Sequence, residues 1–259
     1  MAQPKLCRLF SQTRPIWLAG ILFVLPLSTP LISDGQDVGG LNGDADAILD
    51  ARAMVENMGG IEIWAKLESV HFVHEWDIYS RPDIYLENEI LDLTAPRSYV
   101  TMKSEIYSRI RAYSPEFGYW NIIDGEFAFT DDEALANALE RAPYSIYRLA
   151  RVIARGDSSY RIQYAPLPDM PGTRALAFFG EDSEIHGWIL LNERKEPVVW
   201  ATTQYSYSFG PLERYGNLRV PRWAITGGGR VRYEMVSLVG NNTRPELTLF
   251  APPAEYMPE

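Results

Sequence analysis

Apolar and polar side chains alternate along the chain from Ser69 onward. Phe72, His74 and Trp76 fall on one side of this run, and the residues between them fall on the other. Successive side chains of a β-strand point to opposite faces, so the alternation predicts a strand with one buried face. The same period of two recurs between turn-forming Pro, Gly and Asp-Gly positions. The further predicted strands are 83–93, 98–103, 105–113, 119–123, 126–129, 159–164, 174–179, 184–191, 198–205, 219–225, 230–239 and 247–250.

A helical pattern precedes the first strand, over residues 44–58. Ile48, Ala51 and Val55 recur on one side at helical spacing, and Gly59-Gly60 follows the last turn. Glycine commonly takes the left-handed conformation that ends a helix, so the helix is predicted to stop there. A short helical turn is expected at 62–67.

Two more helical patterns, at 131–139 and 144–155, interrupt the strands. In the second, Ile146 and Leu149 belong to an apolar stripe, and Arg148, Arg151 and Arg155 fall on the other side. Arginine is mostly exposed in folded proteins, so this second face is predicted to be a solvated surface.

Residues 1–35 have the pattern of an export signal. Basic residues come first, an apolar run over 16–27 follows, and small and polar residues come after it. Ser33-Asp34-Gly35 is the best candidate for a cleavage site. Export with cleavage of this signal predicts a protein of the periplasm. The alternative is an uncleaved inner-membrane anchor over 15–32, because that stretch is nearly of bilayer length. Residues 36–43 are predicted to be a flexible lead-in, and 44–259 a single domain.

Charge and cysteine content narrow the function further. The formal net charge is −10, which argues against binding nucleic acid through its phosphates. The only cysteine, Cys7, lies in the predicted export signal. The domain after residue 35 therefore has no disulfide, thiol nucleophile or cysteine metal site.

Few residue patterns point to catalysis or to a metal. His71 and His74 are three apart on a predicted strand, so their rings face opposite sides and cannot share a metal ion. Glu87 and Glu89 share one strand face and could form a carboxylate pair. A secreted carbohydrate-active enzyme that uses such a pair, with Trp and Tyr platforms, is therefore kept as an alternative. The sequence predicts no catalytic residue, no metal and no cofactor.

The predicted strands are rich in aromatic residues, and these allow two interpretations. A filled core would make the protein a structural or interaction domain, because aromatic residues dominate ordinary cores. A curved sheet lined with apolar side chains would instead enclose a ligand cavity. The tryptophans concerned are Trp76, Trp120, Trp188, Trp200 and Trp223.

The order of elements resembles the periplasmic lipoprotein-carrier superfamily, that is, the LolA/LolB-like and outer-membrane lipoprotein-sorting-like proteins. The resemblance covers most of residues 44–253. It rests on short motifs: Met58-Gly59-Gly60 with Trp64 and Leu67-Glu68-Ser69-Val70, the hairpin from Tyr119 to Gly125, Tyr215 to Pro221, the strand from Arg230 to Val239, and Leu247 to Pro253. The chain departs from the family in its proline-rich excursions at 165–172 and 206–222, and it lacks the lipobox of a membrane-anchored receptor.

The resemblance implies a mainly β fold with some α: an unclosed antiparallel β half-barrel wrapped around a few helices. It also implies a cavity for a lipid or the acyl chain of a lipoprotein, with the helices at 131–155 as part of a lid, and an envelope protein as a further partner. Such a protein would be a carrier and not an enzyme. The residues predicted to line the cavity are Phe72, Trp76, Trp120, Trp200, Ile146 and Leu149.

Overall fold

The computed structural model describes residues 40–168, 170–226 and 228–256. The predicted export signal, its cleavage site and most of the lead-in lie outside the described residues. The described residues belong to one compact unit within Gly35–Glu259. No described helix combines the length and the apolar character that crossing a bilayer requires.

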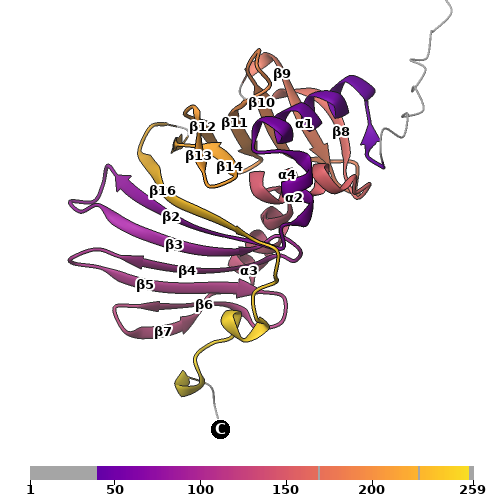
Figure 1. Ribbon diagram of the computed structural model, residues 1–259. Coiled ribbons are helices and arrows are strands. Elements are labelled where there is room, and N and C mark those ends of the chain that lie inside the picture. Colours follow the sequence, from indigo (N-terminus) through magenta and orange to yellow (C-terminus); the bar gives the residue numbers. More distant parts are fainter. Residues whose placement is uncertain (1–39, 169, 227, 257–259) are drawn as a thin grey trace, which may run out of the picture. The chain divides into compact units, whose positions relative to one another are not determined.

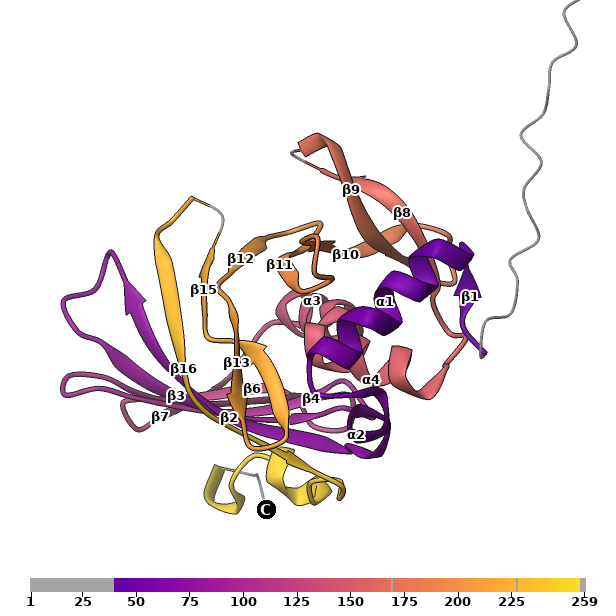
Figure 2. The same ribbon diagram turned by 45° about the horizontal axis from the view of Figure 1, so that its top comes forward.

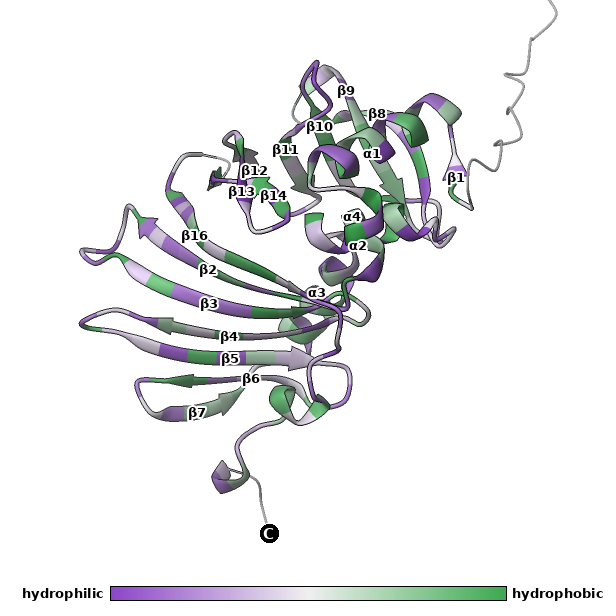
Figure 3. Cartoon of the chain, viewed as in Figure 1, coloured by the Kyte–Doolittle hydropathy of each residue, from purple (hydrophilic) through white to green (hydrophobic). Residues whose placement is uncertain are grey.

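One half of the main sheet is an antiparallel meander of six consecutive strands. Each of its turns joins neighbouring strands, as the alternating pattern predicts. In Figure 3, hydrophilic and hydrophobic residues alternate along these strands. The strands are β2 (Ser69–Ile78), β3 (Tyr85–Asp92), β4 (Arg97–Lys103), β5 (Ser108–Ser114), β6 (Gly118–Ile123) and β7 (Glu126–Phe129).

The other half follows the central helices in sequence and returns to the meander through its last strand. This strand, β16, pairs antiparallel with β2 along its whole length, from Val231 opposite Ile78 to Asn241 opposite Ser69. Chain-distant segments are thereby joined in one sheet (Figure 1). The strands of this half are β8 (Arg161–Leu167), β9 (Met170–Phe179), β10 (Ile185–Leu191), β11 (Pro197–Thr202), β12 (Ser206–Phe209), β15 (Trp223–Thr226) and β16 (Val231–Asn241).

The sheet is not closed into a barrel, which confirms the predicted fold class. A short strand, β1 (Asn42–Gly43), adds in parallel to β8 and forms one end of the strand order. The other end is β7, and the two end strands do not pair with each other. A separate two-stranded ribbon consists of β13 (Leu212–Tyr215) and β14 (Leu218–Pro221).

The helices lie on the concave side of the sheet, between its two halves (Figure 2). They are α1 (Ala45–Asn57), α2 (Ile61–Lys66), α3 (Asp132–Arg141) and α4 (Ile146–Arg155), with the 3₁₀ turn η1 (Ala142–Tyr144) joining the last two. Ser145 caps α4 by accepting from the backbone of Arg148, and Gly156 ends it with φ of 68°. The main core, which includes Trp64 and Phe178, forms where these helices pack on the sheet.

Two predicted strands differ in the structure. Residues 247–250 form a 3₁₀ helix, η2 (Leu247–Phe250), because Pro245, Pro252 and Pro253 flank the segment and proline cannot donate to a strand ladder. The predicted strand 219–225 is divided: β14 ends at Pro221 and β15 begins at Trp223. Each part pairs with different neighbours.

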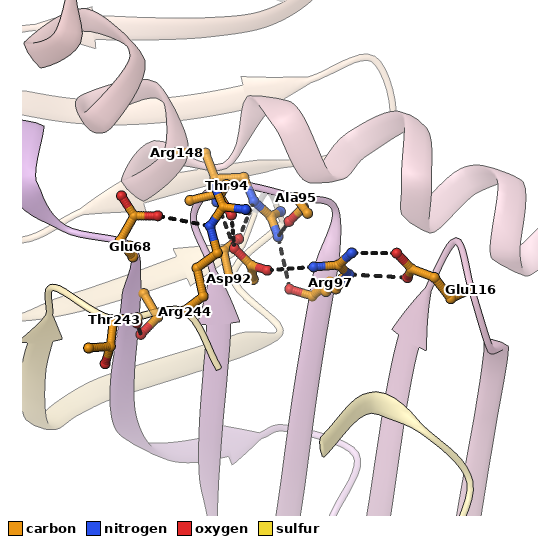
Figure 4. A network of polar contacts seen from close by, with 10 residues as sticks. Glu68, Asp92, Thr94, Ala95, Arg97, Glu116, Arg148, Thr243 and Arg244 are labelled. Atoms are coloured by element: carbon orange, nitrogen blue, oxygen red, sulfur yellow. Dashed lines mark hydrogen bonds and ion pairs between the residues drawn. The ribbon is translucent and has the colours of Figure 1, made fainter. Parts of the chain in front are cut away.

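The predicted solvated arginine face of α4 is wrong for Arg148. Its side chain is buried and donates to the carbonyl oxygens of Asp92 and Ala95 at 2.8 Å, Arg97 at 2.9 Å and Ala142 at 2.6 Å. Three of these acceptors, Asp92, Ala95 and Arg97, belong to the connection between β3 and β4 (Figure 4), and the fourth, Ala142, belongs to η1. Arg155, two helical turns further on, is exposed as predicted.

Candidate ligand-binding cavity

A cavity of about 470 Å³ lies between the inner face of the sheet and the α3–η1–α4 segment. This volume falls within the range of small-molecule sites, roughly 300–1,000 Å³. Strands β2 to β6, β11, β12 and β16 supply one part of its wall, and α3, η1 and α4 supply the other. The interior of the half-barrel is therefore hollow at this place.

Strand register explains why these side chains meet. His74 on β2 lies opposite Glu87 on β3, and Glu87 lies opposite Met102 on β4. Residues directly opposite in an antiparallel sheet point to the same face, so each such row adds one side chain per strand to the wall. A curved sheet turns this face inward around the helices.

Four of the six predicted lining residues border the cavity. Phe72 and Trp76 come from β2, Trp200 from β11 and Ile146 from the first turn of α4. Their contact with a ligand stays a prediction.

The placement of the other two was predicted wrongly. The indole of Trp120 donates to the carbonyl oxygen of Phe250 at 2.9 Å, on the face of β6 that η2 covers. Leu149 is fully buried in the core that α4 shares with α1 and α2 and does not reach the cavity. The predicted periods of β6 and α4 are therefore correct. The prediction assigned the wrong face of β6 to the cavity, and in α4 it assigned a core position to the cavity.

Aromatic rings form a connected part of the wall. The rings of His74 and Tyr233 stack with centroids 4.0 Å apart, and Tyr233 lies 4.9 Å from Trp76 and 6.0 Å from Tyr207. Tyr207 in turn stacks on Trp200 at 5.7 Å. Aromatic rings at such separations attract one another and present a flat, largely apolar surface to a ligand.

Polar and charged groups also reach the cavity, which sequence reasoning did not foresee. Glu87 is 3% exposed, accepts from the indole nitrogen of Trp76 at 3.0 Å and faces an Arg111 guanidinium nitrogen at 3.6 Å. Burial, opposed mainly by Arg111, raises the pKa of Glu87 to about 7. The cavity wall therefore contains a carboxyl group that gains or loses its proton near neutral pH.

Arg111 is enclosed by protein, yet 31% of its side-chain surface stays accessible, on the side that lines the cavity. Burial opposes its charge, but Glu87, Tyr119 and Glu89 together outweigh burial and raise the pKa of the guanidinium above its ordinary value. Its Nε has no hydrogen-bond partner within the described part of the chain. The sequence offered one signal. Arg111 and Tyr113 are neighbours on the inward face of β5, and both carry polar groups.

His74 is 4% exposed, and neither ring nitrogen has a hydrogen-bond partner among the described residues. Burial lowers the pKa of His74 to about 3, so the ring is neutral at physiological pH. Burial raises the pKa of Tyr85 to about 12 and that of Tyr207 and Tyr233 further. The tyrosine hydroxyls of the wall are therefore protonated and can donate.

The carboxylate pair considered for catalysis lies on a single wall. Glu87 and Glu89 both come from β3, and Glu89 accepts from the hydroxyl of Ser98 at 2.6 Å. Each carboxyl group already accepts a hydrogen bond from the protein, Glu87 from Trp76 and Glu89 from Ser98, so the sheet supplies a structural role for both. In the described ranges, no group of three or more His, Cys, Asp or Glu residues is placed to hold a metal ion.

Comparison with known proteins gives only remote likenesses. No family model matches the chain, and no curated protein matches its sequence. A DUF1329 family protein from Desulfovibrio piger shares 4% identity over 78% of this chain and 97% of its own, with a TM-score of 0.45. An uncharacterized conserved protein from Thermus thermophilus shares 12% identity over 82% and 95%, with a TM-score of 0.30.

The MucA/MucB complex structure from Pseudomonas aeruginosa is a further match, with 13% identity over 82% of this chain and 62% of that chain and a TM-score of 0.28. Identities and TM-scores this low do not support a conclusion about the ligand or the partner of this protein. The class of protein is therefore defined by the fold and the cavity alone: an unclosed β half-barrel with a hollow interior.

Proposed function

We propose that this protein is a non-enzymatic binding or carrier protein of the periplasm that holds the apolar part of a lipid, or of an acylated protein, in its half-barrel cavity. The cavity of about 470 Å³ with its connected aromatic wall is the observation that carries this proposal. Transfer of each methylene from water into such a site is worth roughly 0.8 kcal/mol, so an alkyl chain can be held without specific chemistry. The export pattern of residues 1–35 supports the location, and an envelope protein that delivers or receives the ligand stays part of the proposal.

The direct test is native mass spectrometry, with lipid extraction, of the protein purified from its own exported fraction. A co-purifying acyl lipid is the expected result and would identify the ligand class. Protein that carries no lipid and also fails to take up a fluorescent fatty acid would contradict the proposal. A bound sugar in place of a lipid would favour the carbohydrate alternative.

Filling the cavity should abolish uptake. Ile146→Trp places an indole in the cavity from the first turn of α4, and we expect the affinity for a fluorescent fatty acid to fall at least about tenfold, or roughly 1.4 kcal/mol. Ile146→Leu conserves the volume and should bind as the wild type does. Ala138→Phe fills the same cavity from α3 and serves as a second plug if Ile146→Trp folds poorly. Unchanged uptake in both plugged variants would place the ligand elsewhere.

A further inference from the structure

Building on the proposed function, we infer that the bound molecule ends in a carboxylate, that this carboxylate pairs with Arg111, and that Glu87 takes up one proton from solvent as it binds. The ligand class is thereby narrowed from any apolar molecule to a single-headed amphiphile such as a free long-chain carboxylate. Its alkyl chain lies against the aromatic wall.

Among the cavity-lining arginines of the described residues, Arg111 has the fewest hydrogen bonds to the protein. Arg148 uses four of its five N–H groups on backbone carbonyl oxygens. Arg141 donates to the backbone of Asn137 and to the hydroxyl of Tyr205. Arg111 instead keeps 31% of its side chain accessible. It interacts with the side chain of Tyr119 and meets Glu87 only at 3.6 Å, longer than the 2.7–2.9 Å typical of a charge-assisted hydrogen bond.

The charges around Arg111 select a monoanion. A guanidinium recognises a planar carboxylate through two parallel hydrogen bonds. Glu87 and Glu89 line the same cavity from β3, so a group with two negative charges at Arg111 would meet two carboxyl side chains nearby. A carboxylate brings one charge, and it replaces the charge that Glu87 loses on protonation.

Protonation of Glu87 makes this exchange possible. Ionised Glu87 competes for Arg111 and repels the incoming carboxylate, whereas protonated Glu87 leaves Arg111 free and gains an O–H donor. Burial places the pKa of Glu87 at about 7, so either form is readily reached at neutral pH.

The groups that face Glu87 come from five other strands and from its own. Among those whose pKa shifts, His74 is neutral at neutral pH, the tyrosines are protonated and Arg111 is charged. Glu87 is therefore the one member of that set with a pKa near 7. The facing groups are His74 and Trp76 on β2, Tyr85 and Glu89 on β3, Met102 on β4, Arg109 and Arg111 on β5, Tyr207 on β12 and Tyr233 on β16.

Calorimetric titration of the full chain with dodecanoate and with dodecanol tests the inference. The two probes share one alkyl chain and differ in the head group. We expect dodecanoate to bind about tenfold more tightly at about pH 6 than at about pH 8, because a site with a pKa of about 7 must be protonated to accept it. Its own carboxyl group is ionised at both values. Dodecanol should bind with no such change. At about pH 8, where Glu87 is mostly ionised before binding, buffers of different ionisation enthalpy should report uptake of close to one proton with dodecanoate alone, and at about pH 6 this uptake should nearly vanish.

Variants separate this inference from the proposed function. Glu87→Gln mimics the protonated carboxyl, so dodecanoate should bind it equally well at both pH values, whereas the exposed Glu75→Gln on β2 should retain the tenfold change. If Glu87→Gln does not fold, the pH dependence of dodecanoate and dodecanol binding to the wild type still tests whether a carboxylate is recognised. Equal, pH-independent binding of both probes would overturn the inference and leave the proposed function standing. Binding of neither probe would contradict the proposed function itself.

Discussion

Replacing Arg148 with methionine is expected to lower the free energy of unfolding by roughly 3–5 kcal/mol. Methionine keeps most of the aliphatic volume but removes every donor, and the carbonyl oxygens of Asp92, Ala95, Arg97 and Ala142 then lose a buried charged partner. A buried acceptor without a hydrogen bond costs about 1–3 kcal/mol. Urea denaturation followed by tryptophan fluorescence measures the change.

Arg155→Met is the matched control, because it makes the same exchange on the same helix. Arg155 is exposed, and its one recorded hydrogen bond, to the carbonyl oxygen of Ala65, is 3.3 Å long. Its substitution should change the free energy of unfolding by no more than about 0.5 kcal/mol. If Arg148→Met is as stable as Arg155→Met, the carbonyl contacts of Arg148 do not hold the turn between β3 and β4 to α4.

Local periodicity was sufficient to predict a β-rich domain and the inward face of β2, whereas the half-barrel fold class came from the resemblance in the order of elements. The alternation from Ser69 to Ile78 places Phe72 and Trp76 on the same side, and the structure shows that side lining the cavity. The period of two reports a buried face wherever only one face of a strand is covered. That condition holds along β2, whose other face carries the exposed Glu75.

Strand β6 is covered on both faces, and the prediction that Trp120 lines the cavity is wrong for that reason. Tyr119 lines the cavity from one face of the strand, whereas Trp120 is covered on the other face by Phe250, which lies 130 residues further along the chain. With an aromatic residue on each side, alternation alone cannot tell which face is inner. The deciding contact is long-range and comes from a segment that the sequence presented as a strand.

The polar character of the cavity is a second property that local pattern did not reveal. Glu87 was considered only as half of a catalytic pair, and Arg111 was not considered as a binding residue. Their importance comes from register, because β3, β4 and β5 pair so that Glu87 and Arg111 come within 3.6 Å inside the half-barrel. Only the assembled sheet shows that the aromatic wall surrounds a charged pair.

Replacing His74 with leucine is expected to stabilise the protein by about 1–3 kcal/mol at neutral pH. The imidazole is buried, and neither of its nitrogens has a hydrogen-bond partner in the described ranges. Leucine fills a similar volume without a polar atom and so removes the cost of desolvating those nitrogens. Residues that lower stability in this way are often retained for function, and His74 stands directly beside Glu87 in the cavity wall.

The stabilisation by His74→Leu should grow as the pH falls. Burial lowers the pKa of His74 in the folded state to about 3, whereas the unfolded chain titrates near 6.5. The stability linked to this residue is therefore complete above about pH 6.5 and is lost as the pH falls toward 3. Between about pH 7 and pH 5, the wild type should lose about 2 kcal/mol through His74, a loss that the leucine variant lacks.

Glu87 contributes to the pH dependence with the opposite sign. Its pKa is raised in the folded state, so its contribution is complete below the unfolded value of about 4.3 and is lost as the pH rises through about 7. Urea denaturation of His74→Leu at several pH values should therefore be compared within a Glu87→Gln background, where the second titration is removed. A gap between the paired proteins that stays constant from about pH 7 to pH 5 would show that His74 has the same pKa in the fold as in the unfolded chain, and a gap that narrows would show that the fold favours the protonated ring. Only a neutral, desolvated imidazole makes the gap widen.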